Sequence, residues 1–197
     1  SPACAGDTTE VIGTVGSSVT FHIQNPAGSA AMWSFGTDPI ATVIFRASPG
    51  ILFFDGKFRT RFTFPENGRA LSISQLSLAD AGIYSVKMKG ETSTFTLRVY
   101  RELAEPRVTC EAQNCSSGSC RFSLRCSAAG AGLGNVSYLW SVGNLPRGVG
   151  QVLLVEKSPR DEEEPLTCTA QNPVSSRNVS VPTAGGLCAG ESQGRGK

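Results

Sequence analysis

The same order of features occurs twice along the chain: an alternating apolar segment, a tryptophan, and a later apolar segment. In the first half residues 19–23 precede Trp33, and in the second half residues 121–126 precede Trp140. A tryptophan on the strand after such a segment is typical of two packed β-sheets, because its large ring fills the space between them. The repeat therefore predicts two β-sandwiches in tandem, each with one buried tryptophan.

The apolar segments of the first half are short, alternating, and rich in β-branched and aromatic side chains. They are residues 19–23, 40–45, 58–64, 71–76, 83–88 and 94–100. Turn-forming clusters such as Ser48-Pro49-Gly50 separate them. The pattern predicts an all-β fold, and 197 residues are enough for two sandwiches of about 100 residues each.

The sequence changes character near residues 101–106, where a strand-like segment is followed by the charged Arg-Glu-Leu-Ala-Glu-Pro. We place a first domain at residues 1–101 and a second at residues 102–188. Residues 189–197 are rich in Gly, Ser and basic side chains, which predicts a flexible stalk.

The first half carries two features of an immunoglobulin-like domain around residue 80. Asp80-Ala-Gly-Ile-Tyr84 matches the tyrosine corner, in which a tyrosine hydroxyl bonds to the backbone a few residues upstream. Arg61 is placed to form a salt bridge with Asp80 that closes the bottom of a variable-type domain.

The two halves differ in how their sheets are joined. Cys126 and Cys168 predict the inter-sheet disulfide of the second domain, whereas Ile23 and Val86 stand at the equivalent positions of the first. A buried aliphatic pair contributes about 2–3 kcal/mol, which is comparable with a disulfide. The longer stretch between Ile23 and Val86 has room for the additional strands C′ and C″. We therefore expect a variable-type domain without its disulfide, followed by a constant-type domain.

Cysteines and glycosylation sequons indicate an extracellular setting. All cysteines except Cys4 lie in the second half, and the absence of Cys-x-x-Cys disfavours a zinc site. Sequons begin at Asn114, Asn135 and Asn178, which we predict to be glycosylated. Because no run of about 18 apolar residues occurs, we expect no membrane-spanning segment within this sequence.

Composition and motifs argue against enzymes, cofactors and nucleic acid. The net charge is only +2 and the charged fraction 17%, without the basic patch that phosphates attract. His22 is the single histidine, and no Gly-x-Ser-x-Gly motif accompanies it. The contiguous acids 161–164 lack the alternation of a calcium loop. We expect neither catalysis, nor a cofactor, nor a small-molecule substrate.

Several longer motifs point to one family. They are Cys120-Arg-Phe-Ser-Leu-Arg-Cys126, then Cys168-Thr-Ala-Gln-Asn-Pro-Val-Ser175, a final Cys188, the opening residues 11–21 and the junction at residues 100–109. In this order they resemble the signalling lymphocyte activation molecule (SLAM) family of leukocyte receptors, and the resemblance spans nearly the whole chain. It implies a receptor whose first domain binds itself or a related receptor of the family.

The resemblance also implies a second bridge in the second domain, between Cys120 and Cys188. Cys110 and Cys115 are additional to the family's pattern, and their spacing suits a local bridge across a small loop. Cys4 is then left over, either as a free thiol or for an intermolecular bond.

The family's binding mode implies contact through the front sheet of the first domain, made of strands G, F, C, C′ and C″. Because successive strand residues face opposite sides, an inward Trp33 and Tyr84 place their neighbours outward. The partner-binding residues that we predict are Ser34, Thr42, Ile44, Arg46, Phe53, Ser85, Lys87, Lys89, Thr96 and Arg98. For Ile44 and Phe53 a second interpretation stays open, in which they complete a bent sheet edge.

The leading hypothesis is the extracellular region of a leukocyte adhesion and signalling receptor, held at the cell surface by a membrane segment or lipid anchor beyond Lys197. A secreted or viral decoy of the same fold is the alternative, and a purely structural spacer is a third. Self-association would be weak, in the micromolar range or poorer. Lys87, Lys89 and Arg98 make the front sheet basic, which suits an acidic partner. Unless acids such as Glu91 lie opposite Lys87 and Lys89, self-repulsion would weaken a homodimer, so the charge pattern favours a different partner.

Overall fold

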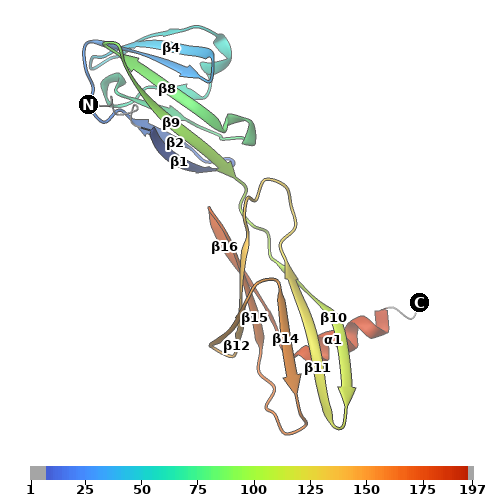
Figure 1. Ribbon diagram of the computed structural model, residues 1–197. Coiled ribbons are helices and arrows are strands. Elements are labelled where there is room, and N and C mark those ends of the chain that lie inside the picture. Colours follow the sequence, from blue (N-terminus) through green and yellow to red (C-terminus); the bar gives the residue numbers. More distant parts are fainter. Residues whose placement is uncertain (1–7, 195–197) are drawn as a thin grey trace. The chain divides into compact units, whose positions relative to one another are not determined.

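The computed structural model describes residues 8–194, so Cys4 and residues 195–197 of the expected stalk lie outside the described part. The chain divides into two compact units, Ser1–Arg101 and Glu102–Lys197. Among the described residues each unit consists of two β-sheets around its own core, and the chain contains one α-helix (Figure 1). The prediction of an all-β fold is confirmed.

Unit 1 has a six-stranded sheet, here called the front sheet, in the order β1-β9-β8-β3-β4-β5. Its strands are β1 (Thr8–Thr14), β3 (Ala30–Phe35), β4 (Asp38–Ile44), β5 (Gly50–Phe53), β8 (Gly82–Met88) and β9 (Glu91–Tyr100). The back sheet consists of β2 (Val19–His22), β7 (Ala70–Ile73) and β6 (Phe62–Thr63). Short 3₁₀ helices are η1 (Gly56–Phe58), η2 (Glu66–Gly68) and η3 (Leu78–Asp80). Strand β1 runs parallel to β9, and the other neighbours in both sheets are antiparallel.

Aromatic rings fill the space between the two sheets of unit 1. Phe21 lies with its ring centroid 5.0 Å from that of Tyr84 and 6.5 Å from that of Trp33, and all three side chains are fully buried. Ile23 and Val86, which stand where a disulfide would join the sheets, are buried in the same cluster. Unit 1 is therefore held together by apolar packing at the position where unit 2 has a covalent bond.

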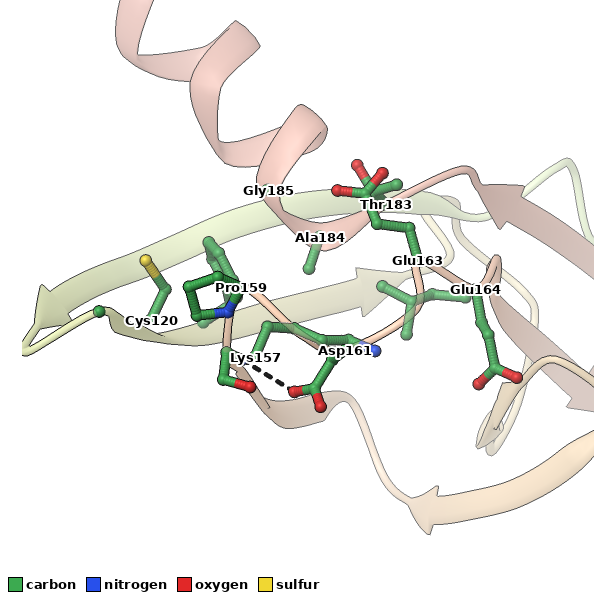
Figure 2. A pocket seen from close by; sticks show the side chains of 13 residues that line it. Cys120, Lys157, Pro159, Asp161, Glu163, Glu164, Thr183, Ala184 and Gly185 are labelled. Carbon is green, nitrogen blue, oxygen red and sulfur yellow. Dashed lines mark hydrogen bonds between the residues drawn. The ribbon is translucent and has the colours of Figure 1, made fainter.

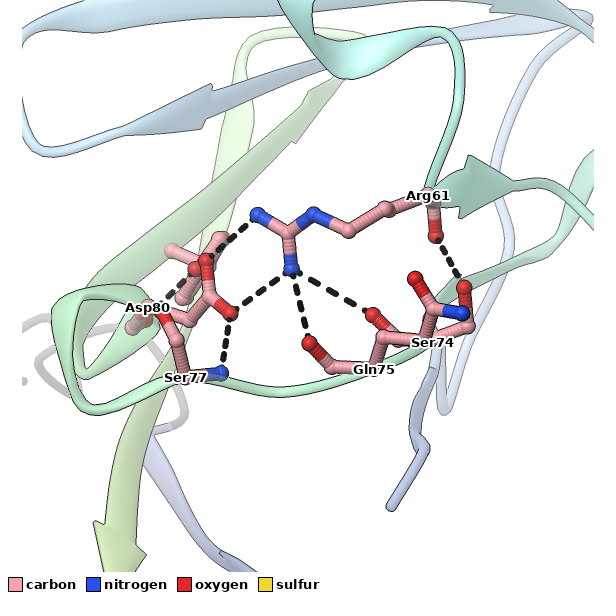
Figure 3. A network of polar contacts seen from close by, with 6 residues as sticks. Arg61, Ser74, Gln75, Ser77 and Asp80 are labelled. Carbon is pink, nitrogen blue, oxygen red and sulfur yellow. Dashed lines mark hydrogen bonds and ion pairs between the residues drawn. The ribbon is translucent and has the colours of Figure 1, made fainter. Parts of the chain in front are cut away.

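A polar network closes one end of this core (Figure 3). The Arg61 guanidinium donates to both carboxylate oxygens of Asp80, each at 2.8 Å, and the Ser77 amide donates to the same carboxylate at 2.8 Å. The Tyr84 hydroxyl donates to the backbone carbonyl of Asp80 at 2.6 Å. The predicted salt bridge and the predicted tyrosine corner are both present, and they share Asp80.

Unit 2 is built from two smaller sheets. One has the order β10-β11-β14 and the other β13-β12-β15-β16. The strands are β10 (Arg107–Ser116), β11 (Ser119–Ser127), β12 (Ser137–Val142), β13 (Leu145–Val149), β14 (Val152–Lys157), β15 (Leu166–Asn172) and β16 (Ser175–Val181). Trp140 is fully buried on β12 and lies opposite Cys168 of β15, which is bonded to Cys126 of β11. Trp140 therefore lies beside the bridge that joins the two sheets.

The chain continues into helix α1 (Ala184–Gly194) after the last strand. The sequence predicted a flexible stalk from Ala189, but residues 189–194 have helical backbone. The side chains of Ala184 and Cys188 anchor the helix, because both are buried in the core of unit 2. The short apolar stretch at 184–188 gave no helical period from which this could be predicted.

Three disulfides connect the described cysteines: Cys110 with Cys188, Cys115 with Cys120, and Cys126 with Cys168. The Cys126–Cys168 prediction is confirmed, whereas the Cys120–Cys188 and Cys110–Cys115 pairings are wrong.

The register of one hairpin explains the correction. Cys110 and Cys115 stand on the same strand, β10. Its rise separates their Cα atoms by about 15 Å, beyond the roughly 7 Å that a disulfide spans. Cys115 instead lies opposite Cys120 across the β10–β11 turn, with 4.0 Å between Cα atoms. Cys110 is then bonded to Cys188 of α1, at a Cα distance of 5.2 Å.

A double digestion tests this pairing, because Glu111 lies between Cys110 and Cys115 and offers a cleavage site there. After cleavage at Arg107, Glu111 and Arg121 without reduction, the fragment 108–111 should be linked only to the Cys188 peptide. The fragment 112–121 should carry an internal bond. Mass spectrometry of the deglycosylated digest would contradict the structure if those two fragments were linked to each other.

Substitution of Asp80 tests the network at the end of the first core. Burial opposes ionisation of Asp80, but hydrogen bonds from Arg61 and Ser77 outweigh it and hold the pKa of this carboxyl below its ordinary 3.8. The stabilisation is therefore complete above about pH 4 and is lost as the pH falls toward the folded-state pKa. Asp80→Asn should lower the free energy of unfolding by about 2–4 kcal/mol at pH 7.

Urea unfolding at pH 7 and at pH 3 measures this difference, which should shrink at the lower pH. Asp161→Asn is the matched control, since the Asp161 carboxylate also accepts a backbone hydrogen bond but is fully exposed. A loss of stability that is the same at both pH values, or the same for both variants, would contradict the role given to Asp80.

Candidate partner-binding face

The outer face of the front sheet, here called the front face, is set by strand alternation and register. One row of side chains crosses it: Leu52 lies opposite Thr42, Thr42 opposite Met32, Met32 opposite Lys87, and Lys87 opposite Thr92. Residues paired in this way point to the same side of a sheet. Trp33 and Val86, the strand neighbours of Met32 and Lys87, point to the core instead and are fully buried.

Three apolar side chains are exposed at the β3-β4-β5 end of the front face. Met32 is 37% exposed, Ile44 46% and Leu52 66%. They belong to neighbouring strands, so they form one cluster and not scattered single residues. Arg46 borders this cluster, because its Nη2 and the Cδ1 of Ile44 both lie over Gly50, 3.1 and 3.3 Å from where a Cβ atom would be.

The charges on the front face are unevenly distributed. Arg98 of β9 forms a salt bridge with Glu10 of β1 at 3.3 Å, which neutralises that end. Lys87 forms no salt bridge with any residue in the described range 8–194. Glu91 does not offset Lys87 directly, because it lies opposite Met88 on the core-facing side of the strand. The positive charge therefore gathers beside the apolar cluster.

Most of the predicted binding residues share this face. Thr42 and Ile44 come from β4, Ser34 from β3, Ser85 and Lys87 from β8, and Thr96 and Arg98 from β9. Lys89 lies in the β8–β9 turn, and its aliphatic stem covers Gly28. Arg46 follows β4 and donates from Nε to the Ser48 carbonyl at 2.7 Å.

Phe53 is the exception, and its prediction as a front-face residue is wrong. It lies opposite the buried Ala41 on the core side, with its ring 5.9 Å from that of Phe64. Its neighbour Leu52 points outward in its place. Residues 51–54 are apolar throughout, so alternation could not tell which ones face out; the β4–β5 register decides it.

Met32, Ile83 and Ile12 are further exposed apolar residues of this face that the sequence prediction missed. Met32 and Ile83 could have been found, because each precedes a residue that was predicted to point inward. Ile12 could not have been found from the sequence, because its place on this face depends on the pairing of β1 with β9.

Unit 2 contains a pocket that is lined by polar and apolar side chains (Figure 2). It has a volume of about 260 Å³ and lies between Cys120 of β11, the loop at 157–164 and the start of α1. Asp161 accepts a hydrogen bond from the Ser158 amide at 2.8 Å, which lowers the pKa of its carboxyl. Within residues 8–194, no group of His, Cys, Asp or Glu side chains is arranged to hold a metal ion.

The three sequon asparagines all lie in unit 2, and all are exposed. Asn114 is on β10, Asn135 precedes β12, and Asn178 is on β16. None is on the front face of unit 1.

Comparisons with known proteins define the relationship. The chain is 31% identical to human SLAM family member 7 over 200 residues, which is 95% of this chain and 59% of that protein. It is 32% identical to human SLAM family member 5, over 95% of this chain and 57% of that protein. The chain thus spans little more than half the length of these curated relatives. No protein-family model matches it.

A solved structure of the CD2-binding domain of CD58 superposes with a TM-score of 0.63 at 19% identity, over 89% of this chain and 97% of that one. At this identity the similarity shows the fold alone, which is immunoglobulin-like. None of the helices between residues 8 and 194 is long and apolar enough to cross a bilayer.

The two sandwich units define the class by fold, namely immunoglobulin-like proteins. Within this class the chain belongs to the SLAM family, as the sequence motifs predicted.

Paired substitutions at residues 52 and 53 test the assignment of the two side chains. Phe53→Ala removes a half-buried ring and should lower the free energy of unfolding by about 2 kcal/mol. Leu52→Ala should change it by less than about 0.5 kcal/mol, because Leu52 packs against little of the protein. Chemical denaturation of both variants measures this, and the reverse order would show that the register of β5 is wrong.

Proposed function

We propose that this chain is the extracellular part of a leukocyte cell-surface adhesion and signalling receptor, and that the front face of unit 1 binds its partner. The partner is a second copy of the chain or a related SLAM-family receptor. The observation that carries the proposal is the apolar cluster of Met32, Ile44 and Leu52 beside Lys87, on the outer face of a six-stranded sheet.

We also propose that unit 1 is a variable-type domain and unit 2 a constant-type domain. The nine strands described in unit 1 support the first assignment, with β4 and β5 in the places of C′ and C″ beside β3. The seven strands described in unit 2 support the second, although β13 joins the sheet of β12 and not the opposite one. On this assignment the front face is the GFCC′C″ face.

Binding would depend on the burial of a small apolar surface, and the neighbouring charges would select the partner. Covering the cluster removes apolar side chains from water, which contributes roughly 25 cal/mol per Å² of apolar surface. The polar threonine and serine side chains around it resemble the rim of a transient interface. A single sheet face of this kind supports an affinity in the micromolar range or weaker.

The charge beside the cluster bears on the choice of partner. Lys87 and Arg46 border the apolar side chains, whereas the acidic Glu10 forms a salt bridge with Arg98 at the β1–β9 end. A two-fold self-contact centred on the cluster would place like charges together. Like charges that face each other cost affinity, so the pattern favours a partner that carries acidic residues at the same place.

Sedimentation equilibrium of the glycosylated chain at high concentration tests the homophilic form, with Lys87→Glu and Ile44→Asp variants. Surface plasmon resonance against SLAM-family ectodomains tests the heterophilic form with the same variants. Ile44→Asp should weaken either contact at least tenfold, because it places an acid within the apolar cluster. Lys87→Glu should weaken a heterophilic contact by a similar factor, because it replaces the positive charge that an acidic partner would bind.

Thr63→Asp is the matched control, since Thr63 is exposed on β6 of the back sheet. It should leave binding unchanged. A chain that is strictly monomeric and binds no SLAM-family ectodomain, or an interaction that Thr63→Asp weakens as much as Ile44→Asp, would refute the proposal.

A further inference from the structure

The outer face of the β10-β11-β14 sheet in unit 2 has an apolar groove next to a glycosylation sequon. Asn114 lies opposite Arg121, and Arg121 lies opposite Glu156. The next row holds Ser123 and, opposite it, Leu154. The groove has a volume of about 370 Å³, and Asn114 and Leu154 both line it.

Leu154 has no structural role in the core of unit 2. It is 78% exposed, whereas its neighbour Leu153 points inward and is buried. It lies on β14, which is the edge strand of its sheet. An exposed aliphatic side chain on an edge strand favours unwanted pairing with other chains, and proteins commonly cover such edges.

We propose that the N-glycan on Asn114 folds back into this groove and covers Leu154 with its first sugar rings. Leu154 lies two strand spacings across the sheet and two residues along it from Asn114, about 12 Å in all. The Asn114 side chain and two N-acetylglucosamine rings cover this distance. The glycan is attached at one wall of the groove, so it occupies the groove at a high effective concentration.

The chemistry of the groove fits this occupant. One face of an N-acetylglucosamine ring carries mainly C–H groups, which pack on an aliphatic side chain such as Leu154. Its hydroxyl and acetamido groups need hydrogen-bond partners. Arg121 and Glu156, whose side chains form an ion pair at 3.5 Å between Asn114 and the far strand, offer both donors and an acceptor.

Covering this face would shield the exposed side chains of β14 from other proteins. It would also fix the orientation of the glycan, because a sugar packed on a sheet loses the freedom of one that extends into solvent. The inference concerns unit 2 alone and does not depend on which partner the front face binds.

The rate at which peptide N-glycanase releases each glycan from the native protein tests the proposal. Release in ¹⁸O-water marks every freed asparagine, and mass spectrometry then follows Asn114, Asn135 and Asn178 separately. A glycan that is docked about nine-tenths of the time should be released about tenfold more slowly than one that is free, because the enzyme needs the undocked form. The glycan at Asn114 should therefore be released more slowly than the glycan at Asn178.

Leu154→Ser should raise the release rate at Asn114 to within about twofold of the rate at Asn178, since it removes the apolar contact. Leu145→Ser is the matched control, because Leu145 is an exposed leucine on β13 of the other sheet. It should leave the Asn114 rate unchanged.

Three results would overturn the proposal: an unmodified Asn114, equal release rates at Asn114 and Asn178, or slow release at Asn114 that persists in Leu154→Ser. The last result would show that something other than this groove protects the glycan.

Discussion

The front face of unit 1 depends on the aromatic packing directly behind it. Phe21 of the back sheet contacts the rings of Trp33 and Tyr84 of the front sheet, and no disulfide joins the two sheets at this point. Every inward ring forces its strand neighbours outward, so the core determines which residues a partner can reach. Asp80 supports this arrangement from one end, because it binds the Arg61 guanidinium and receives the Tyr84 hydroxyl on its carbonyl.

In unit 2, disulfides hold the sheets and the helix together. One disulfide joins its two sheets beside Trp140, a second closes the β10–β11 hairpin, and a third fastens helix α1 to β10. The three sequons also lie in this unit. The two units therefore differ in surface as well as in core: one presents an apolar and basic surface, whereas the other carries the sequons and the three disulfides.

This division is consistent with a receptor that binds through unit 1 with modest affinity. In the proposed function, the apolar cluster would supply attraction, and Lys87 beside it would select against an identical face. A weak contact between single molecules is strengthened when many copies are held on opposing surfaces, because the effective concentration rises. For such a protein the charge pattern decides the partner more than the buried area does.

The sequence alone determined what depends on local alternation: the sandwich fold, the two tryptophans, the Asp80 network, the Cys126–Cys168 bridge, and the outward direction of Lys87. Its motifs also indicated the family. Tertiary structure decided whatever depends on how separate strands pair. The register of β5 against β4 turned Phe53 inward and Leu52 outward, and the β10–β11 hairpin placed Cys115 opposite Cys120. Neither follows from sequence spacing, because a shift of one residue in strand register moves every side chain to the other face.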